Sequence, residues 1–262
     1  MSKIELPKSL KVETVGRVAV LRLSRAEKRN ALTDEMVNGL SLFFRHVSSD
    51  IGAVVLCGEG PTFCAGLDLS EALATATFHD AVRHSQMWHR GFQDIQFGSV
   101  PVVSVLHGAV VGGGLELAAA THIRVAEASA YYGLPEGQRG LFLGGGGSVR
   151  LPRLIGTQRV MDMMLTGRTM SAEEGHAIGI SQYLTGAGEG LAKGIEIANK
   201  IATNAPVSNF AILHALPRNG EGDVTAGYLT ESLMAGSAQT TPEAKERLAA
   251  FLTKQAAKVA RP

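Results

Sequence analysis

The sequence has few of the features that mark secreted, membrane or metal-binding proteins. It contains only two cysteines, Cys57 and Cys64, too few for a disulfide framework or a set of zinc ligands. The N-terminal residues include no apolar signal core, and no run reaches about 18 apolar residues without charge or glycine. We therefore expect a soluble protein of the reducing cytoplasm, with no membrane partner and no metal.

The sequence also has no excess of positive or negative charge. Lys and Arg number 25 and Asp and Glu 24, which gives a formal net charge of +1. Nucleic-acid-binding proteins usually carry a basic excess, so no nucleic acid partner is expected. A small phosphorylated ligand stays possible, because net charge says nothing about pockets. No repeat, low-complexity segment or linker interrupts the 262 residues, which are enough for a sizeable core.

Hydrophobic periodicity predicts alternating strands and helices in the first part of the chain. Strands are expected at 17–25, 53–60, 100–114 and 122–133. Helices are expected at 33–47, 113–121, 157–167, 171–179 and 190–206, and from Thr241 onward. The helix at 171 begins with a capping box, Ser171 with Glu174. The pattern predicts an α/β core followed by a mostly helical C-terminal region.

The stretch GGGLELA (112–118) places Glu116 directly after three glycines in an apolar run. Unpaired N–H groups at a helix start favour developing negative charge. A second backbone donor, from the turn at 65–67, could complete an oxyanion hole. From spacing alone two structural alternatives remain: a tight turn for the glycines, and a buried ion pair with Arg124 for Glu116.

A second carboxylate, Glu136, follows a proline in LPEGQRG (134–140). Two carboxyl groups in one partly apolar cavity push their pKa values apart, so that one holds a proton while the other accepts one. Such a pair could move a proton and activate a water beside a polarised carbonyl. For Gly144–Gly147 we expect a close crossing of two backbones, because the run matches neither a P-loop nor a Rossmann loop.

With these motifs the sequence resembles the crotonase superfamily, the enoyl-CoA hydratase/isomerase proteins, from about Ile4 to Lys254. The matching runs are RAEKRNALTDEM, GEGPTFCAGLDL, HGAVVGGGLELAAATHIRVA, LPEGQRGLFLGGGGSVRLPRLIG and AEEGHAIGI. The resemblance implies a crotonase-like spiral of ββα units at 1–195. It also implies a C-terminal helical region at 196–262 that contacts CoA and mediates homotrimers, commonly paired into homohexamers. The substrate would be an acyl-CoA thioester, with no separate cofactor because coenzyme A is part of the substrate.

The resemblance also implies roles for single residues. The N–H groups of Leu67 and Gly113 would bind the thioester oxygen, and Gly144 would help to seat a water between Glu116 and Glu136. Many isomerases keep one or neither glutamate, so the pair favours syn hydration of a 2-enoyl-CoA. Which glutamate is the acid stays open. The further contacts expected with substrate or CoA are Lys28, Arg29, Ala31, Ala65, Gly66, Asp68, Leu69, Phe251 and Lys254.

The chain departs from the family pattern near Glu136. Leu143 and Val149 stand where the family usually has proline and glutamine, and EGQRG is more polar than usual. Arg139 is expected to pair with one of the two glutamates or to lie at a subunit contact. Three other functions stay open: an enoyl-CoA isomerase, a hydroxycinnamoyl-CoA hydratase-lyase assisted by Tyr228, and a non-catalytic subunit that binds acyl-CoA.

Segment 70–97 is expected to contribute to the acyl pocket and the core through Met87, Trp88 and Phe92. His79, His84 and His89 recur every five residues, which turns each about 140° from the last on a helix. They cannot share one metal-binding face, so we expect scattered surface histidines.

Overall fold

The computed structural model describes residues 5–74 and 77–253. The chain divides into two compact units, Met1–Ala202 and Thr203–Pro262. Within the described ranges, no helix combines the length and the apolar character needed to cross a membrane. Each unit is described separately below.

The first unit is built on two sheets. The larger sheet has the order β1-β2-β3-β4-β6-β9, in which only the β1–β2 pair is antiparallel. Its strands are β1 (Leu10–Val15), β2 (Val18–Leu23), β3 (Ala53–Gly58), β4 (Val102–Leu106), β6 (Ile123–Glu127) and β9 (Tyr183–Thr185). The smaller sheet contains β5 (Ala109–Val111), β7 (Tyr131–Gly133) and β8 (Thr169–Ser171).

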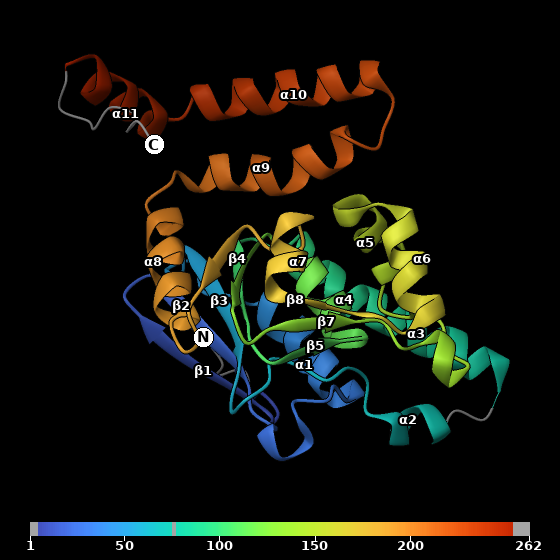
Figure 1. The fold of residues 1–262 in the computed structure, drawn as a ribbon. Coiled ribbons are helices and arrows are strands. Elements are labelled where there is room, and N and C mark those ends of the chain that lie inside the picture. The colour runs from blue at the N-terminus through green and yellow to red at the C-terminus, as the bar shows by residue number, and fades with distance from the viewer. Residues whose placement is uncertain (1–4, 75–76, 254–262) are drawn as a thin grey trace. The chain divides into compact units, whose positions relative to one another are not determined.

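Helices cover both faces of the larger sheet. One face packs on α1 (Asp34–Arg45), α3 (Phe78–Gln96) and α4 (Gly113–Ala120), and the other packs on α8 (Gly190–Ala202), as Figure 1 shows. Because both faces are buried, β3 and β4 are continuous apolar runs rather than alternating ones. The expected strand at 53–60 is confirmed as β3. The segment 100–114 contains β4, the short strand β5 of the smaller sheet, and the start of α4.

The chain moves repeatedly between the two sheets. It passes from β4 to β5 and then into α4, and later from β6 to β7 and then into helices, so the ββα unit recurs. Gly108 allows the first crossing, since its φ is +53° and a Cβ there would lie 2.1 Å from the carbonyl oxygen of Pro61. The remaining helices of this unit are η1 (Ala26–Lys28), α2 (Leu69–Ala74), η2 (Gly137–Arg139), α5 (Gly147–Ile155), α6 (Thr157–Thr166) and α7 (Ala172–Ala177).

The second unit consists of α9 (Pro206–Asn219), α10 (Val224–Gln239) and α11 (Pro242–Leu252). The helix expected at 190–206 is corrected, because α8 ends at Ala202 and Pro206 is the first residue of α9. Proline has no N–H to donate, so it is well suited to a first helical position. The expected boundary between 195 and 196 falls inside α8, which packs on the larger sheet of the first unit.

Sequence patterns located most of the other elements. The strands expected at 17–25 and 122–133 are confirmed as β2 and as the pair β6 and β7, and the capping box of α7 is present. The expected elements did not include β1, α2, α3, α5, β8 or β9, and the helices α9 and α10 were expected only as part of a helical region. In α5 the signal is hidden, because the helix begins inside a glycine run and has Pro152 in its interior.

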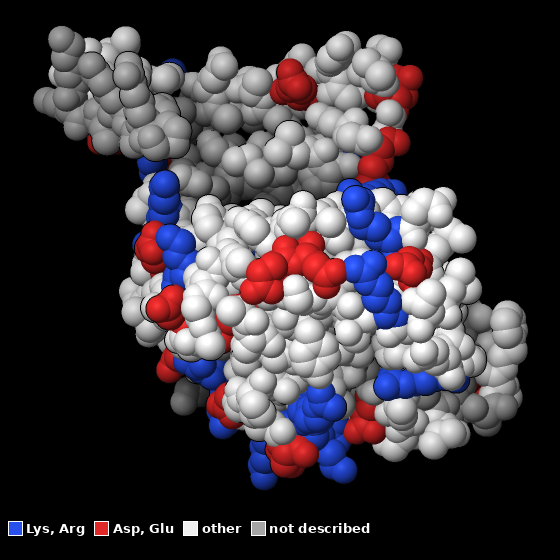
Figure 2. All heavy atoms as spheres, viewed as in Figure 1, with Lys and Arg blue, Asp and Glu red and all other residues white. Residues whose placement is uncertain are grey.

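The surface carries charges of both signs. On the face of the first unit drawn in Figure 2, groups of Lys and Arg lie close to groups of Asp and Glu. Several opposite charges form exposed ion pairs, such as Arg168 with Asp162 and Lys193 with Glu196. This distribution agrees with the near-zero net charge of the sequence.

Candidate active site

The glycines before Glu116 form the start of α4. Gly112 has φ +54° and donates its N–H to the carbonyl oxygen of Gly133 at 2.9 Å. A Cβ on Gly113 would lie only 3.3 Å from the backbone nitrogen of Leu67. The two amide groups predicted to bind the thioester oxygen are therefore neighbours, and in the described part of the chain neither has a hydrogen-bond acceptor.

The N–H of Leu67 stays unpaired because the hydrogen bonds to Leu32 are made by its neighbours, Gly66 and Asp68. Leu32 and Leu67 form a parallel bridge. In this bridge Leu32 donates to Gly66 O at 2.7 Å and accepts from Asp68 N at 2.8 Å. In a parallel bridge the residue between the two bonded positions directs its own N–H away from the partner strand. The N–H of Leu67 is thus available to a ligand.

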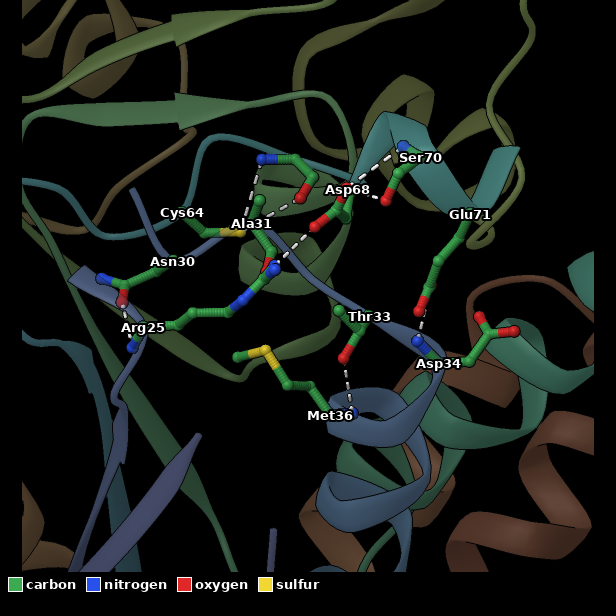
Figure 3. A network of polar contacts seen from close by, with 11 residues as sticks. Arg25, Asn30, Ala31, Thr33, Asp34, Met36, Cys64, Asp68, Ser70 and Glu71 are labelled. Atoms are coloured by element: carbon green, nitrogen blue, oxygen red, sulfur yellow. Dashed lines mark hydrogen bonds and ion pairs between the residues drawn. The ribbon is translucent and has the colours of Figure 1, made fainter. Parts of the chain in front are cut away.

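A polar network holds this turn against the segment after β2. Figure 3 shows Asp68 between Arg25 and Ser70. Arg25 Nη1 donates to Asp68 Oδ2 at 2.7 Å and to Ala31 O at 3.0 Å. The hydrogen bonds from Ser70, followed by that from Arg25, lower the pKa of Asp68 to about 2. Arg25 thus holds the predicted contact residues Ala31 and Asp68 together, and Leu69 follows directly as the first residue of α2.

Glu116 is buried on α4, with its carboxylate bound by the glycine run. Its Oε1 accepts hydrogen bonds from the N–H groups of Gly147 at 2.7 Å and Gly145 at 2.9 Å. Burial raises the pKa of Glu116, while these N–H groups and the charge of Arg150 act in the opposite direction. The glycines make the contact possible, because a Cβ on Gly147 would lie 2.6 Å from Glu116 Cγ.

The suggested ion pair between Glu116 and Arg124 is not present. Arg124 donates to the carbonyl oxygens of Ile180 and Thr121 instead. The cation that influences Glu116 is Arg150, which donates from Nη1 to Gly145 O at 2.9 Å. The sequence did not reveal Arg150 as a neighbour of Glu116, because Arg150 lies on α5, which was not among the expected helices.

Glu136 is the second buried carboxyl group of the site, and its partners differ from those of Glu116. Its Oε2 is buried and has no hydrogen-bond partner among the described atoms. Its Oε1 would lie 2.7 Å from a Cβ on Gly112. Burial, with a smaller contribution from the charge of Glu116, raises the pKa of Glu136 to about 7. Arg139 forms no ion pair with either glutamate in the described residues, although its charge lowers this pKa.

The two glutamates and the two free amides face one cavity of about 510 Å³. Gly144 also lines it, and its carbonyl oxygen accepts a hydrogen bond from Ser85 at 2.8 Å. The apolar part of the wall comes from Leu69, Phe78, Trp88, Leu141, Phe142 and Leu143. Such a cavity offers an anion site, two carboxyl groups and an apolar wall to a single ligand.

Comparison with known proteins identifies the family. The sequence profile of the enoyl-CoA hydratase/isomerase family matches residues 13–260. The chain belongs to this family. The chain is 30% identical to the short-chain-enoyl-CoA hydratase of Clostridium acetobutylicum over 247 residues, covering 93% of this chain and 94% of that one.

Solved structures of family members have the same fold. A crystal structure of a candidate enoyl-CoA hydratase from Rhodopseudomonas palustris is 54% identical with a TM-score of 0.92, covering 99% of this chain and 100% of that one. The enoyl-CoA hydratase of Bacillus anthracis is 29% identical with a TM-score of 0.88, covering 94% and 97%. The predicted crotonase-like α/β fold is thereby confirmed.

The other residues predicted to contact CoA lie in different places in this family member. Lys28 and Arg29 are exposed at and just after η1, and Arg29 Nη2 donates to Tyr131 Oη at 2.9 Å. Arg29, Ala65 and Arg139 line a further cavity of about 240 Å³. Phe251 is 53% exposed on α11 in the second unit, and Lys254 lies outside the described residues.

Two expectations about neighbours of the site were wrong. Across Gly144–Gly147, a Cβ at each glycine would meet only side-chain atoms of other residues, such as Phe92 at Gly145 and Glu116 at Gly147, and no other backbone. His84 and His89 are half-buried rather than on the surface, and His84 Nε2 lies 2.7 Å from Asp34 Oδ1. Only the periodicity of α3 could have revealed this, by placing residue 84 one turn before Trp88 on the same face.

Proposed function

We propose that the protein is an enoyl-CoA hydratase, which adds water syn across the C2=C3 bond of a 2-enoyl-CoA. The observation that carries the proposal is the presence of two buried glutamates with different partners in the cavity where two unpaired amides meet. Burial raises the pKa of both glutamates, but hydrogen bonds from backbone N–H groups of other residues stabilise the charged form of Glu116, so Glu136 suits the acid and Glu116 the base.

The proposed reaction follows from the surroundings of the two glutamates and the two unpaired amides. The thioester oxygen accepts hydrogen bonds from Leu67 N–H and Gly113 N–H, each contributing roughly 3 kcal/mol as negative charge develops. Glu116 is ionised and takes a proton from the water that attacks C3. Glu136 is protonated near neutral pH and delivers its proton to C2 of the enolate, while Gly144 helps to seat the water. One water is consumed: its hydroxyl group forms the bond to C3, and its proton stays on Glu116. A proton must then pass from Glu116 to the ionised Glu136, directly or through solvent, before the next turnover.

The proposal needs no resident cofactor or metal, because coenzyme A enters with the substrate. The cavity wall suits an apolar acyl group, since two of the hydroxyl groups near it already have partners within the protein. Thr77 Oγ1 donates to Asp80 at 2.6 Å, and Ser85 donates to Gly144 O. The cytoplasm is the proposed location, in keeping with Cys57 and Cys64, which are both free and buried.

We also propose that the protein assembles as a homotrimer or as a homohexamer of two trimers. The support comes from the second unit, where large apolar side chains are exposed to solvent on every helix. A surface of this kind usually marks an interface between proteins. These side chains include Phe210, Ile212, Leu216, Tyr228, Leu229, Leu233 and Leu248.

The proposal is tested with a panel of 2-enoyl-CoA thioesters, followed by the loss of their conjugated absorbance. Glu136→Gln is expected to lose most of its turnover while keeping its affinity for CoA, because the amide cannot release a proton. The matched control is Glu196→Gln on the exposed surface of α8. Isomerisation of a 3-enoyl thioester without hydration would instead support an isomerase, and the absence of any turnover would support a binding subunit.

A further inference from the structure

One residue, Asp34, links three helices at the wall of the cavity. Asp34 is the first residue of α1, and its backbone N–H donates to Glu71 Oε2 of α2 at 2.8 Å, as Figure 3 shows. Its Oδ1 accepts a hydrogen bond from Trp88 Nε1 at 2.9 Å and lies 2.7 Å from His84 Nε2. Both of these side chains belong to α3 and line the cavity.

Trp88 is placed directly beside the proposed oxyanion site. Its Cζ3 would lie 3.1 Å from a Cβ on Gly113, and the residue is 3% exposed. On its other side the indole packs edge-on against Phe92, with ring centroids 5.6 Å apart. A rotation of the indole would therefore change the shape of the cavity next to Gly113.

The orientation of the indole depends on its hydrogen bond to Asp34. A buried indole N–H needs an acceptor, and a carboxylate is a stronger acceptor than a neutral group. Trp88 is buried although the Asp34 side chain is 42% exposed, so removal of the carboxylate would leave the indole N–H to water or to no acceptor. His84 binds the same oxygen, so the carboxylate is itself held in one orientation.

We propose that Asp34 is a positioning residue for the acyl pocket, because it holds Trp88 against Gly113 and so determines how the acyl group is seated. The inference rests on the proposed function only in taking an acyl-CoA as the ligand of this cavity. Asp34 acts through Trp88 rather than through contact with the reacting atoms.

The same cluster raises one competing explanation. Asp34, Glu71 and His84 offer ligand atoms that lie within 4.8 Å of one another, a spacing that would suit a metal ion. The hydrogen bonds given above already account for this spacing. A metal ion would compete with the indole N–H and with His84 for the same carboxylate oxygen, so the two explanations predict different responses to metal.

The chain provides its own probe, because Trp88 is its one tryptophan. Asp34→Ala is expected to lower the fluorescence anisotropy of Trp88 and to raise KM for a 2-enoyl-CoA about tenfold, with a smaller change in kcat. Asp34→Asn keeps an acceptor oxygen and is expected to restore most of both values. The control Glu35→Ala removes a charge from the same first turn of α1 and is expected to change neither.

A double-mutant cycle separates the role of the indole N–H from a general loss of stability in Asp34→Ala. Trp88→Phe removes the indole N–H but retains an aromatic ring. If Asp34 acts through that N–H, adding Asp34→Ala to Trp88→Phe should raise KM by much less than Asp34→Ala does in the unaltered chain. Equal effects in both backgrounds would overturn the proposal.

Binding of saturated acyl-CoA thioesters, followed by tryptophan quenching, separates this inference from the proposed reaction. If no enoyl-CoA is hydrated but Asp34→Ala still weakens saturated acyl-CoA binding, the positioning role stands and the hydratase proposal fails. Unchanged anisotropy and unchanged binding in Asp34→Ala would overturn the positioning role. Altered anisotropy of the unaltered protein on adding Zn²⁺, reversed by EDTA, would replace it by a metal site.

Discussion

Glu116 and Glu136 share a cavity, but their hydrogen-bonding surroundings differ. Glu116 receives two backbone N–H groups, whereas Glu136 has a buried oxygen without a partner. Hydrogen bonds from N–H groups stabilise a carboxylate, and burial without them stabilises the neutral acid. The difference supports proposing Glu136 as the acid, a choice that the sequence left open.

The raised pKa of Glu136 predicts a stability cost at alkaline pH. Its value of about 7 in the folded protein lies above the ordinary 4.5, so the folded state binds more protons than the unfolded chain between these values. Stability therefore falls as pH rises through this window. Glu136→Gln should be more stable at pH ~8, by up to about 3 kcal/mol, and the gain should shrink toward pH ~5. Urea unfolding at both pH values measures this; a less stable variant at the higher pH would contradict it.

Gly147 should be intolerant of even one added methyl group. A Cβ there would lie 2.6 Å from Glu116 Cγ and 2.8 Å from Glu116 Oε1, so the carboxylate must move. Displacement of a reacting group by about 1 Å can cost roughly a hundredfold in rate, which is the loss of kcat expected for Gly147→Ala. Gly236→Ala is the control, since nothing lies within 4 Å of its Cβ position. A normal kcat in Gly147→Ala would contradict the role proposed for Glu116.

At the scale of elements, the N-terminal ends of α4 and α7 satisfy their backbone N–H groups in different ways. The start of α4 has no side-chain cap, which leaves the N–H of Gly113 free to face the cavity. The start of α7 has a complete capping box, in which Ser171 and Glu174 satisfy each other's backbone N–H groups. Sequence located both starts, but only the hydrogen bonds separate a ligand-binding end from a structural one.

The capping box predicts a change in stability without a change in activity. Ser171→Ala removes the acceptor of Glu174 N–H, now bound at 3.2 Å, and should lower the free energy of unfolding by about 1 kcal/mol. Ser171→Asp keeps an acceptor and should retain most of the stability. Chemical denaturation measures the difference, and kcat/KM should stay unchanged in both variants. Equal stability of Ser171→Ala and the unaltered protein would refute the assignment.

At the scale of the whole molecule, the second unit presents apolar side chains that a monomer would leave in water. If the proposed assembly buries them, Leu233→Asp should shift the protein toward smaller species, because a charge would be buried without a partner. Ser237→Asp adds the same charge to α10 without removing an apolar side chain and serves as the control. Light scattering after size exclusion measures the mass. A monomeric unaltered protein would refute the assembly.

The sequence alone indicated the family and the α/β fold, and it singled out Glu116 and Glu136 as candidates. These follow from local patterns, such as the glycines before Glu116 and the apolar runs of β3 and β4. Tertiary structure alone decided which groups surround the carboxylates. The N–H groups of Gly145 and Gly147, the charge of Arg150 and the bond between Asp34 and Trp88 join residues that are far apart in the chain. Electrostatics and burial act through space, so the pKa values and shape of the site emerge only when the chain is folded.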